Sequence, residues 1–180
     1  FRRGVRDIEW PVGTFWLAFL RRGRLAMTAP TIVFFGYDLV PKTTPKIFLR
    51  TLLYSTAAQG QVVEGMYAVL RREGAERAFS FWGYGESEKL SPGSGLHVSR
   101  CGLAANHHFV MSVHDADYLF EPGCYTIVVY ARVVGRRKPI KLSELEIGVS
   151  AEQSRAMKCG NGMLFERRLE GGYEGHARER

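Results

Sequence analysis

Residues 124–134 read Cys-Tyr-Thr-Ile-Val-Val-Tyr-Ala-Arg-Val-Val, and this stretch decides the fold class. β-Branched and aromatic residues dominate it, and apolar side chains recur at every second position from Tyr125 to Val133. That period is the one of a β-strand with one buried face. Gly135, a basic run and Pro139 then supply turn residues. The stretch therefore predicts a long β-strand that ends in a tight turn.

Similar runs recur along the chain at short intervals, with Gly, Pro and charged residues between them. Strands at this spacing are typical of an all-β sandwich or barrel. In addition to 124–134, we expect strands over residues 31–37, 46–54, 61–71, 78–84, 106–113, 141–149 and 163–169. One short helix is expected near 151–158, because Ser150 and Gln153 have the spacing of a capping box and Gly160 suits a left-handed stop.

Two resemblances extend this reading. Pro122-Gly123-Cys124-Tyr125 is similar to the start of a late strand in immunoglobulin and fibronectin-type sandwiches. This likeness implies an immunoglobulin-like antiparallel β-sandwich of about seven or eight strands, with a tyrosine that braces a corner. The motif order also resembles that of uncharacterised bacterial proteins of unknown function, in which membrane-spanning segments precede a soluble β-domain. The motifs lie at 45–50, 93–96, 106–109, 123–125 and 150–153.

Length and composition fit one globular domain with an extension, and they exclude a fully disordered or collagen-like chain. We predict an Arg- and aromatic-rich N-terminal segment (1–30), a β-sandwich domain (31–169) and a flexible charged tail (170–180). Three cysteines form no disulfide framework, which favours a reducing compartment. With the bacterial resemblance, this places the protein on the cytoplasmic side, in association with a membrane.

The N-terminal segment carries much of the positive charge. Residues 1–30 hold six arginines against two acidic residues, which is +4 of the chain's net +7. Residues 10–20 are almost wholly apolar but would span only about 16 Å as a helix, too little to cross a bilayer. Two interpretations stay open: a membrane-interfacial segment, or an arm whose aromatic side chains pack on the domain. The candidate interfacial residues are Trp10, Phe15, Trp16, Arg21, Arg22 and Arg24.

The body contains one dense basic group, with Arg136, Arg137 and Lys138 at its centre. It suits a phosphate, an RNA backbone or anionic lipid, or it is a solvated turn whose charges protect a sheet edge. A ligand pocket could add His107, His108 and Trp82. Because His107 and His108 are adjacent in a predicted strand, we expect their side chains on opposite faces. Without a second ligand pair nearby, we predict no metal site.

No catalytic constellation is present, since the chain has neither a nucleophile elbow nor a phosphate-binding loop. We therefore predict no catalytic residue and no cofactor. The expected function is a non-enzymatic binding or interaction module held near a membrane, with an anionic membrane surface and a protein or small ligand as partners. The alternatives are a sensor of an anionic small molecule such as a nucleotide, and an uncharacterised hydrolase. Nucleic acid is disfavoured because most of the charge excess lies outside the folded body.

Overall fold

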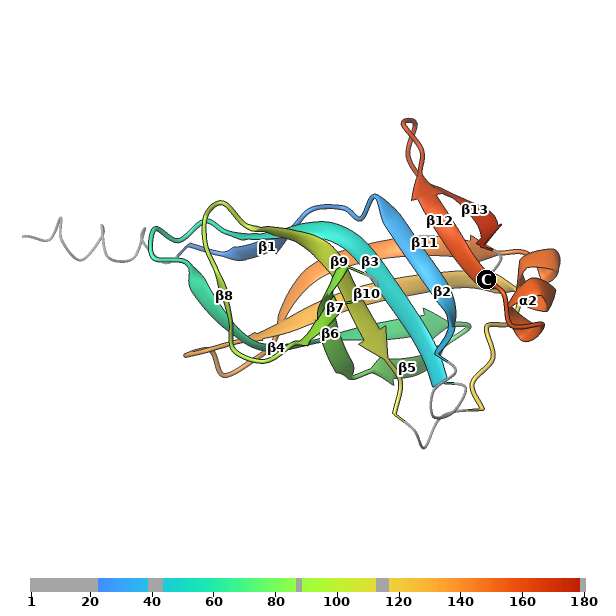
Figure 1. Cartoon of the computed structure of the whole chain (residues 1–180), viewed down its shortest axis with the longest axis horizontal. Coiled ribbons are helices and arrows are strands. Elements are labelled where there is room, and N and C mark those ends of the chain that lie inside the picture. Colours follow the sequence, from blue (N-terminus) through green and yellow to red (C-terminus); the bar gives the residue numbers. More distant parts are fainter. Residues whose placement is uncertain (1–22, 39–43, 87–88, 113–116, 179–180) are drawn as a thin grey trace, which may run out of the picture.

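The computed structural model describes residues 23–38, 44–86, 89–112 and 117–178. In these residues an eight-stranded and a five-stranded antiparallel sheet enclose one hydrophobic core (Figure 1). Helix α2 (Ala151–Lys158) lies at one end of the two sheets. The prediction of an all-β sandwich with one short helix is confirmed.

The order of strands in each sheet follows from the pairing. The larger sheet runs β13 (Tyr173–Arg178), β12 (Gly162–Arg167), β2 (Ile32–Asp38), β3 (Thr44–Ser55), β9 (Leu103–Val110), β6 (Phe81–Glu86) and β7 (Lys89–Pro92), and β1 (Leu25–Met27) pairs with β3. The smaller sheet runs β11 (Ile140–Val149), β10 (Gly123–Val133), β4 (Gln61–Arg72) and β5 (Ala75–Phe79), and β8 (Leu96–Val98) pairs with β4.

Strand β10 is the stretch from which the fold was predicted, and it lies between β4 and β11. Its alternate apolar residues from Tyr125 to Val133 are all buried, as their period requires. At this hydrophobic face the two sheets meet, because the core cluster joins these residues to inward side chains of β2, β3 and β9. Burial of apolar surface therefore fixes the register of β10.

The strand predicted over 78–84 is wrong as a single element. Strand β5 belongs to the smaller sheet and β6 to the larger, and Ser80 is the one residue between them. We expected Phe79 and Phe81 on the same face, but Phe79 is fully buried and Phe81 is 66% exposed. The chain crosses between sheets at this point, so the alternation restarts on the other side of the core.

Thirteen strands are present in the described part of the chain, more than the seven or eight expected. Strands β1, β7, β8 and β13 are too short or too polar to show the alternation of a long buried strand; each pairs with a neighbour, and Leu25 of β1 and Val98 of β8 also join the core. Strand β1 falls in the predicted N-terminal segment. Strand β13 falls in the predicted flexible tail, where it pairs with β12 along its whole length and the Tyr173 hydroxyl donates to Pro30 O at 2.9 Å.

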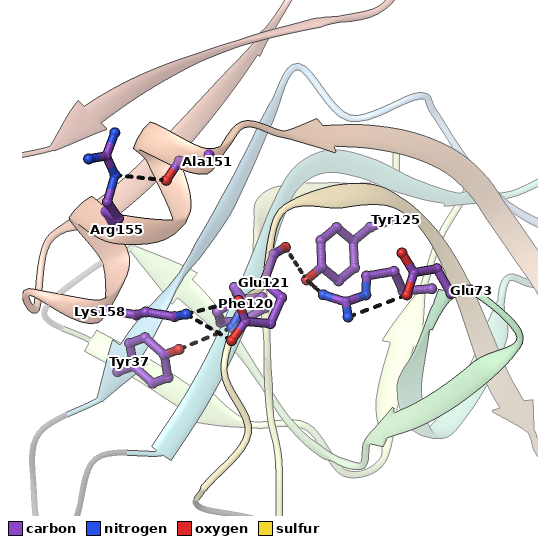
Figure 2. A network of polar contacts seen from close by, with 9 residues as sticks. Tyr37, Glu73, Phe120, Glu121, Tyr125, Ala151, Arg155 and Lys158 are labelled. Carbon is purple, nitrogen blue, oxygen red and sulfur yellow. Dashed lines mark hydrogen bonds and ion pairs between the residues drawn. The ribbon is translucent and has the colours of Figure 1, made fainter.

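A tyrosine braces the start of β10. The hydroxyl of Tyr125 donates to Glu121 O at 2.6 Å and accepts from Arg72 Nη1 at 3.3 Å (Figure 2). Lys158 on α2 bonds to both carboxylate oxygens of Glu121, at 2.8 and 2.9 Å. These contacts tie β4, β10 and α2 together at one end of the sandwich, which we call the corner end. The predicted bracing tyrosine is confirmed.

Helix α2 begins and ends where its local sequence directs. The Ser150 side chain accepts from Gln153 N at 3.1 Å, and the Gln153 side chain accepts from Ser150 N at 2.9 Å. This is the predicted capping box, which satisfies two amides that the helix leaves free. Gly160 follows with a φ of +92°, a conformation that favours glycine.

Candidate functional site

Six exposed basic side chains lie at the end of the sandwich where β4 begins and β10 ends. They come from the residue before β1, the turn after β8, the end of β10 and the turn between β10 and β11. We call this group the basic end: Arg24, Arg100, Arg132, Arg136, Arg137 and Lys138. None of the six forms an ion pair with a described residue. Their charge is therefore available to an external anion.

Hydrogen bonds fix the backbone at the basic end, where the N-terminal segment joins the sandwich. Thr56 N donates to Arg24 O at 2.8 Å, and Arg24 N donates to Thr56 Oγ1 at 2.7 Å. Gln61 Nε2 donates to Gly23 O at 3.2 Å. A Cβ atom on Gly23 would overlap the backbone of Ala57, so this close approach requires glycine. Residue 23 therefore holds a defined position beside the free cations.

Apolar side chains are exposed among these charges. Val134, in the turn between β10 and β11, is 55% exposed, and Val62 on β4 is 37% exposed. The two residues are joined by a hydrogen bond from Val134 N to Val62 O at 3.0 Å. Gly135 follows at a φ of +80°, and Arg136 N donates to Val133 O at 3.0 Å to close the turn. A tight turn thus presents an apolar tip directly before the basic run.

A hollow of about 800 Å³ lies beside this turn. Its walls are the turn at 57–60, Gly23, Gln61 and the turn residues Val134 to Arg136. Small residues predominate in the walls, so backbone is accessible there. The hollow adjoins the basic end and shares Arg136 with it.

His107 and Trp82 form a buried pair in the larger sheet. Trp82 Nε1 donates to His107 Nδ1 at 3.3 Å, and their rings stack with centroids 6.1 Å apart. His107 is fully buried and Trp82 is 4% exposed. Burial, and secondarily repulsion from His108 when that ring is protonated, lower the pKa of His107 to about 4. The ring is therefore neutral at pH 7, and neither side chain is exposed to a ligand from solution.

His108 points to the other face of the same strand, as predicted for adjacent strand residues. Its ring lies 5.0 Å from that of Phe48, and it contacts the backbone of Gly85 without a well-aligned hydrogen bond. Burial and the nearby Lys46 ammonium lower the pKa of His108 to about 4, although Asp38 opposes the shift. His108 is thus a second buried, neutral imidazole.

The structure brings together only part of the predicted ligand set. Arg136, Arg137 and Lys138 share one exposed turn, whereas His107, His108 and Trp82 lie within the larger sheet on β9 and β6. Sequence reasoning missed Arg100, which joins the basic end through a turn that precedes β9. The backbone hydrogen bond from Ser55 N to Ser99 O at 3.1 Å positions that turn, and no local sequence motif predicts this position.

Most of the predicted membrane-interfacial residues lie outside the described part of the chain: Trp10, Phe15, Trp16, Arg21 and Arg22. Arg24 is described and belongs to the basic end. Within the described ranges no helix combines the length and apolarity needed to cross a bilayer. In the same ranges, no three His, Cys, Asp or Glu side chains are grouped to hold a metal ion.

No family model, curated protein or solved structure matches this chain.

Proposed function

We propose that the protein is a non-enzymatic binding module held at an anionic membrane surface by its basic end and its N-terminal segment. One observation carries the proposal. Six exposed cations without an ion pair among the described residues surround the point at which the arginine- and aromatic-rich segment joins the sandwich. Each basic residue near an anionic bilayer contributes about 1 kcal/mol of binding free energy.

The apolar tip supports a lipid over a nucleic acid. Val134 precedes Arg136 in the same turn, so contact with a bilayer would bury an exposed apolar side chain while the cations meet phosphate groups. A nucleic-acid surface would leave that side chain without an apolar partner. Aromatic residues interleaved with the charges, on which bases could stack, are also missing from this described turn.

The wider assignment forms part of the same proposal. The Tyr125–Glu121 bond supports kinship with immunoglobulin-like sandwiches, in which a tyrosine bonds back to the chain a few residues upstream. Bacterial origin and the cytoplasmic face of the membrane follow from the motif resemblance and the cysteine usage. The basic end would then face the bilayer and the corner end would face away from it.

Flotation of the full chain with liposomes tests the proposal. We expect the chain to float with vesicles that contain phosphatidylserine and to be released by salt, because surface electrostatics are screened. The variant R136Q/R137Q/K138Q removes three of the cations and should bind about a hundredfold more weakly.

A matched variant separates location from net charge. R155Q/R167Q/R178Q makes the same change in charge with exposed arginines outside the basic end, and should float like the unaltered chain. Equal losses in the two triple variants, or no flotation of the unaltered chain, would contradict the proposal.

A further inference from the structure

A second hollow lies at the corner end, beside β5 at the edge of the smaller sheet. It has a volume of about 220 Å³ between the β4–β5 hairpin and the segment that leads into β10. At about 30 Å³ for a water molecule in the liquid, it has room for about seven waters. That space suits one amino-acid side chain. We call this hollow the arginine pocket.

The hairpin register explains which side chains form one wall. Leu70 pairs with Arg77 and Arg72 pairs with Ala75, so these four side chains point to the inner side of the smaller sheet. Leu70 is buried and provides an apolar floor, while Arg77 is exposed. An inward guanidinium at a sheet edge thus lies over an apolar surface.

The opposite wall comes from the segment before β10. Tyr118 and Leu119 line it, and Leu119 is 45% exposed although it is large and apolar. Burial raises the pKa of Tyr118, so its hydroxyl stays protonated. The pocket therefore combines apolar walls with a hydroxyl and two guanidinium groups.

The charges that face the pocket leave one cation free. Glu121 is neutralised by Lys158, and Glu73 lies 3.6 Å from Arg72 Nη2 (Figure 2). Arg72 also donates to Tyr125. Arg77 makes only a long bond to a backbone carbonyl, at 3.5 Å, and no ion pair with a described residue.

We propose that the arginine pocket binds the C-terminal carboxylate of a protein partner whose last residue is apolar. The carboxylate would accept hydrogen bonds from Arg77, while the last side chain would pack between Leu70 and Leu119. A guanidinium fork matches a carboxylate in shape and charge. This inference goes beyond the proposed membrane contact and does not depend on it, because the two sites lie at opposite ends.

Titration of the isotope-labelled full chain, followed by amide resonances, tests the inference without any membrane. The probes are a short acetylated alanine peptide that ends in leucine, the same peptide with an amidated C-terminus, and an amidated peptide with an internal aspartate. We expect saturable shifts at Ala75 and Leu119 with the first peptide alone. Equal shifts with the amidated leucine peptide, or with the aspartate peptide, would overturn the inference.

Two variants assign the binding to the pocket. R77Q should lower the affinity for the free-carboxylate peptide by about threefold to fivefold, the range of an exposed ion pair. L119S should weaken it through the lost apolar wall, and both residues are exposed, so the fold is expected to persist. The control R155Q removes an exposed arginine on α2 at the same end and should bind like the unaltered chain.

The alternative role of Arg77 is to discourage pairing at the free edge of β5, as inward charges on edge strands do. An unchanged affinity of R77Q for the peptide would show that this is its only role and would overturn the inference.

Discussion

The two ends of the sandwich both carry basic side chains but place them in different surroundings. At the corner end, Arg72 and Lys158 bind acceptors within the chain, Tyr125, Glu73 and Glu121. At the basic end, six cations have no ion pair with a described residue. The cations of the corner end that bind acceptors in the chain therefore support the fold. The cations of the basic end have no such acceptor among the described residues, so they stay free for external anions.

The largest effect on stability is expected from the region between the two ends. His107 and His108 have a pKa of about 4 in the folded protein and about 6.5 when unfolded. As the pH falls below 6.5 the unfolded chain takes up protons first, so stability is complete above 6.5 and decreases until about pH 4. Urea titrations should show a loss of about 4 kcal/mol between pH 7 and pH 5.

The variant H108F isolates this effect from other acid-sensitive groups. A phenyl ring can keep the contact with Phe48 but cannot titrate, so about half of the acid-induced loss should vanish. An unchanged dependence on pH would show that the histidines do not control acid stability.

The next prediction compares a Tyr-to-Phe substitution at the corner end with one near the basic end. Y125F removes a hydroxyl that bonds to Glu121 O and Arg72, and leaves both part-buried groups without that partner. We expect it to lower the free energy of unfolding by about 2 kcal/mol. Y54F alters a half-buried tyrosine near the basic end whose hydroxyl forms no hydrogen bond with a described residue, and should change stability by less than about 0.5 kcal/mol. Equal losses would remove the contrast between the ends.

A smaller effect is expected at the helix cap. S150A removes the side-chain oxygen that accepts from Gln153 N and should cost about 1 kcal/mol by thermal unfolding. S99A, in an exposed turn at the basic end, is the matched control and should leave the midpoint unchanged. A loss for S99A as large as that for S150A would argue against a special role of the capping box.

The smallest effect on stability is expected from R136Q/R137Q/K138Q. These cations are exposed and have no ion pair among the described residues, so the free energy of unfolding from urea titrations should stay within about 0.5 kcal/mol of that of the unaltered chain. A large loss would mean that the basic end serves the fold, and that its cations are not free for an outside partner.

Features with local causes were predictable from the sequence. The alternation from Tyr125 to Val133 specifies a buried strand face, and Ser150, Gln153 and Gly160 specify the bounds of α2. In each case the interacting groups lie within a few residues of one another. The exposed turn with Arg136 was likewise visible as a basic run between two strands.

Features that depend on register or on chain crossing were not predictable. Phe79 and Phe81 have the spacing of one face, yet the crossover at Ser80 separates them into core and surface. Trp82 meets His107 only because β6 pairs with β9. The arginine pocket needs Arg77 and Leu119 together, two residues far apart in the sequence that only the tertiary fold unites.

The short pairing of β1 with β3 also has a mechanical meaning. Leu25 pairs with Ser55 and Met27 with Leu53, so β1 runs inward from the basic end. Antiparallel hydrogen bonds lie perpendicular to the strands, and a pull on residue 23 along the axis of β1 would load them together in shear. A tether that leaves the sandwich at Gly23 would therefore transmit force into the largest sheet without peeling its first strand away bond by bond.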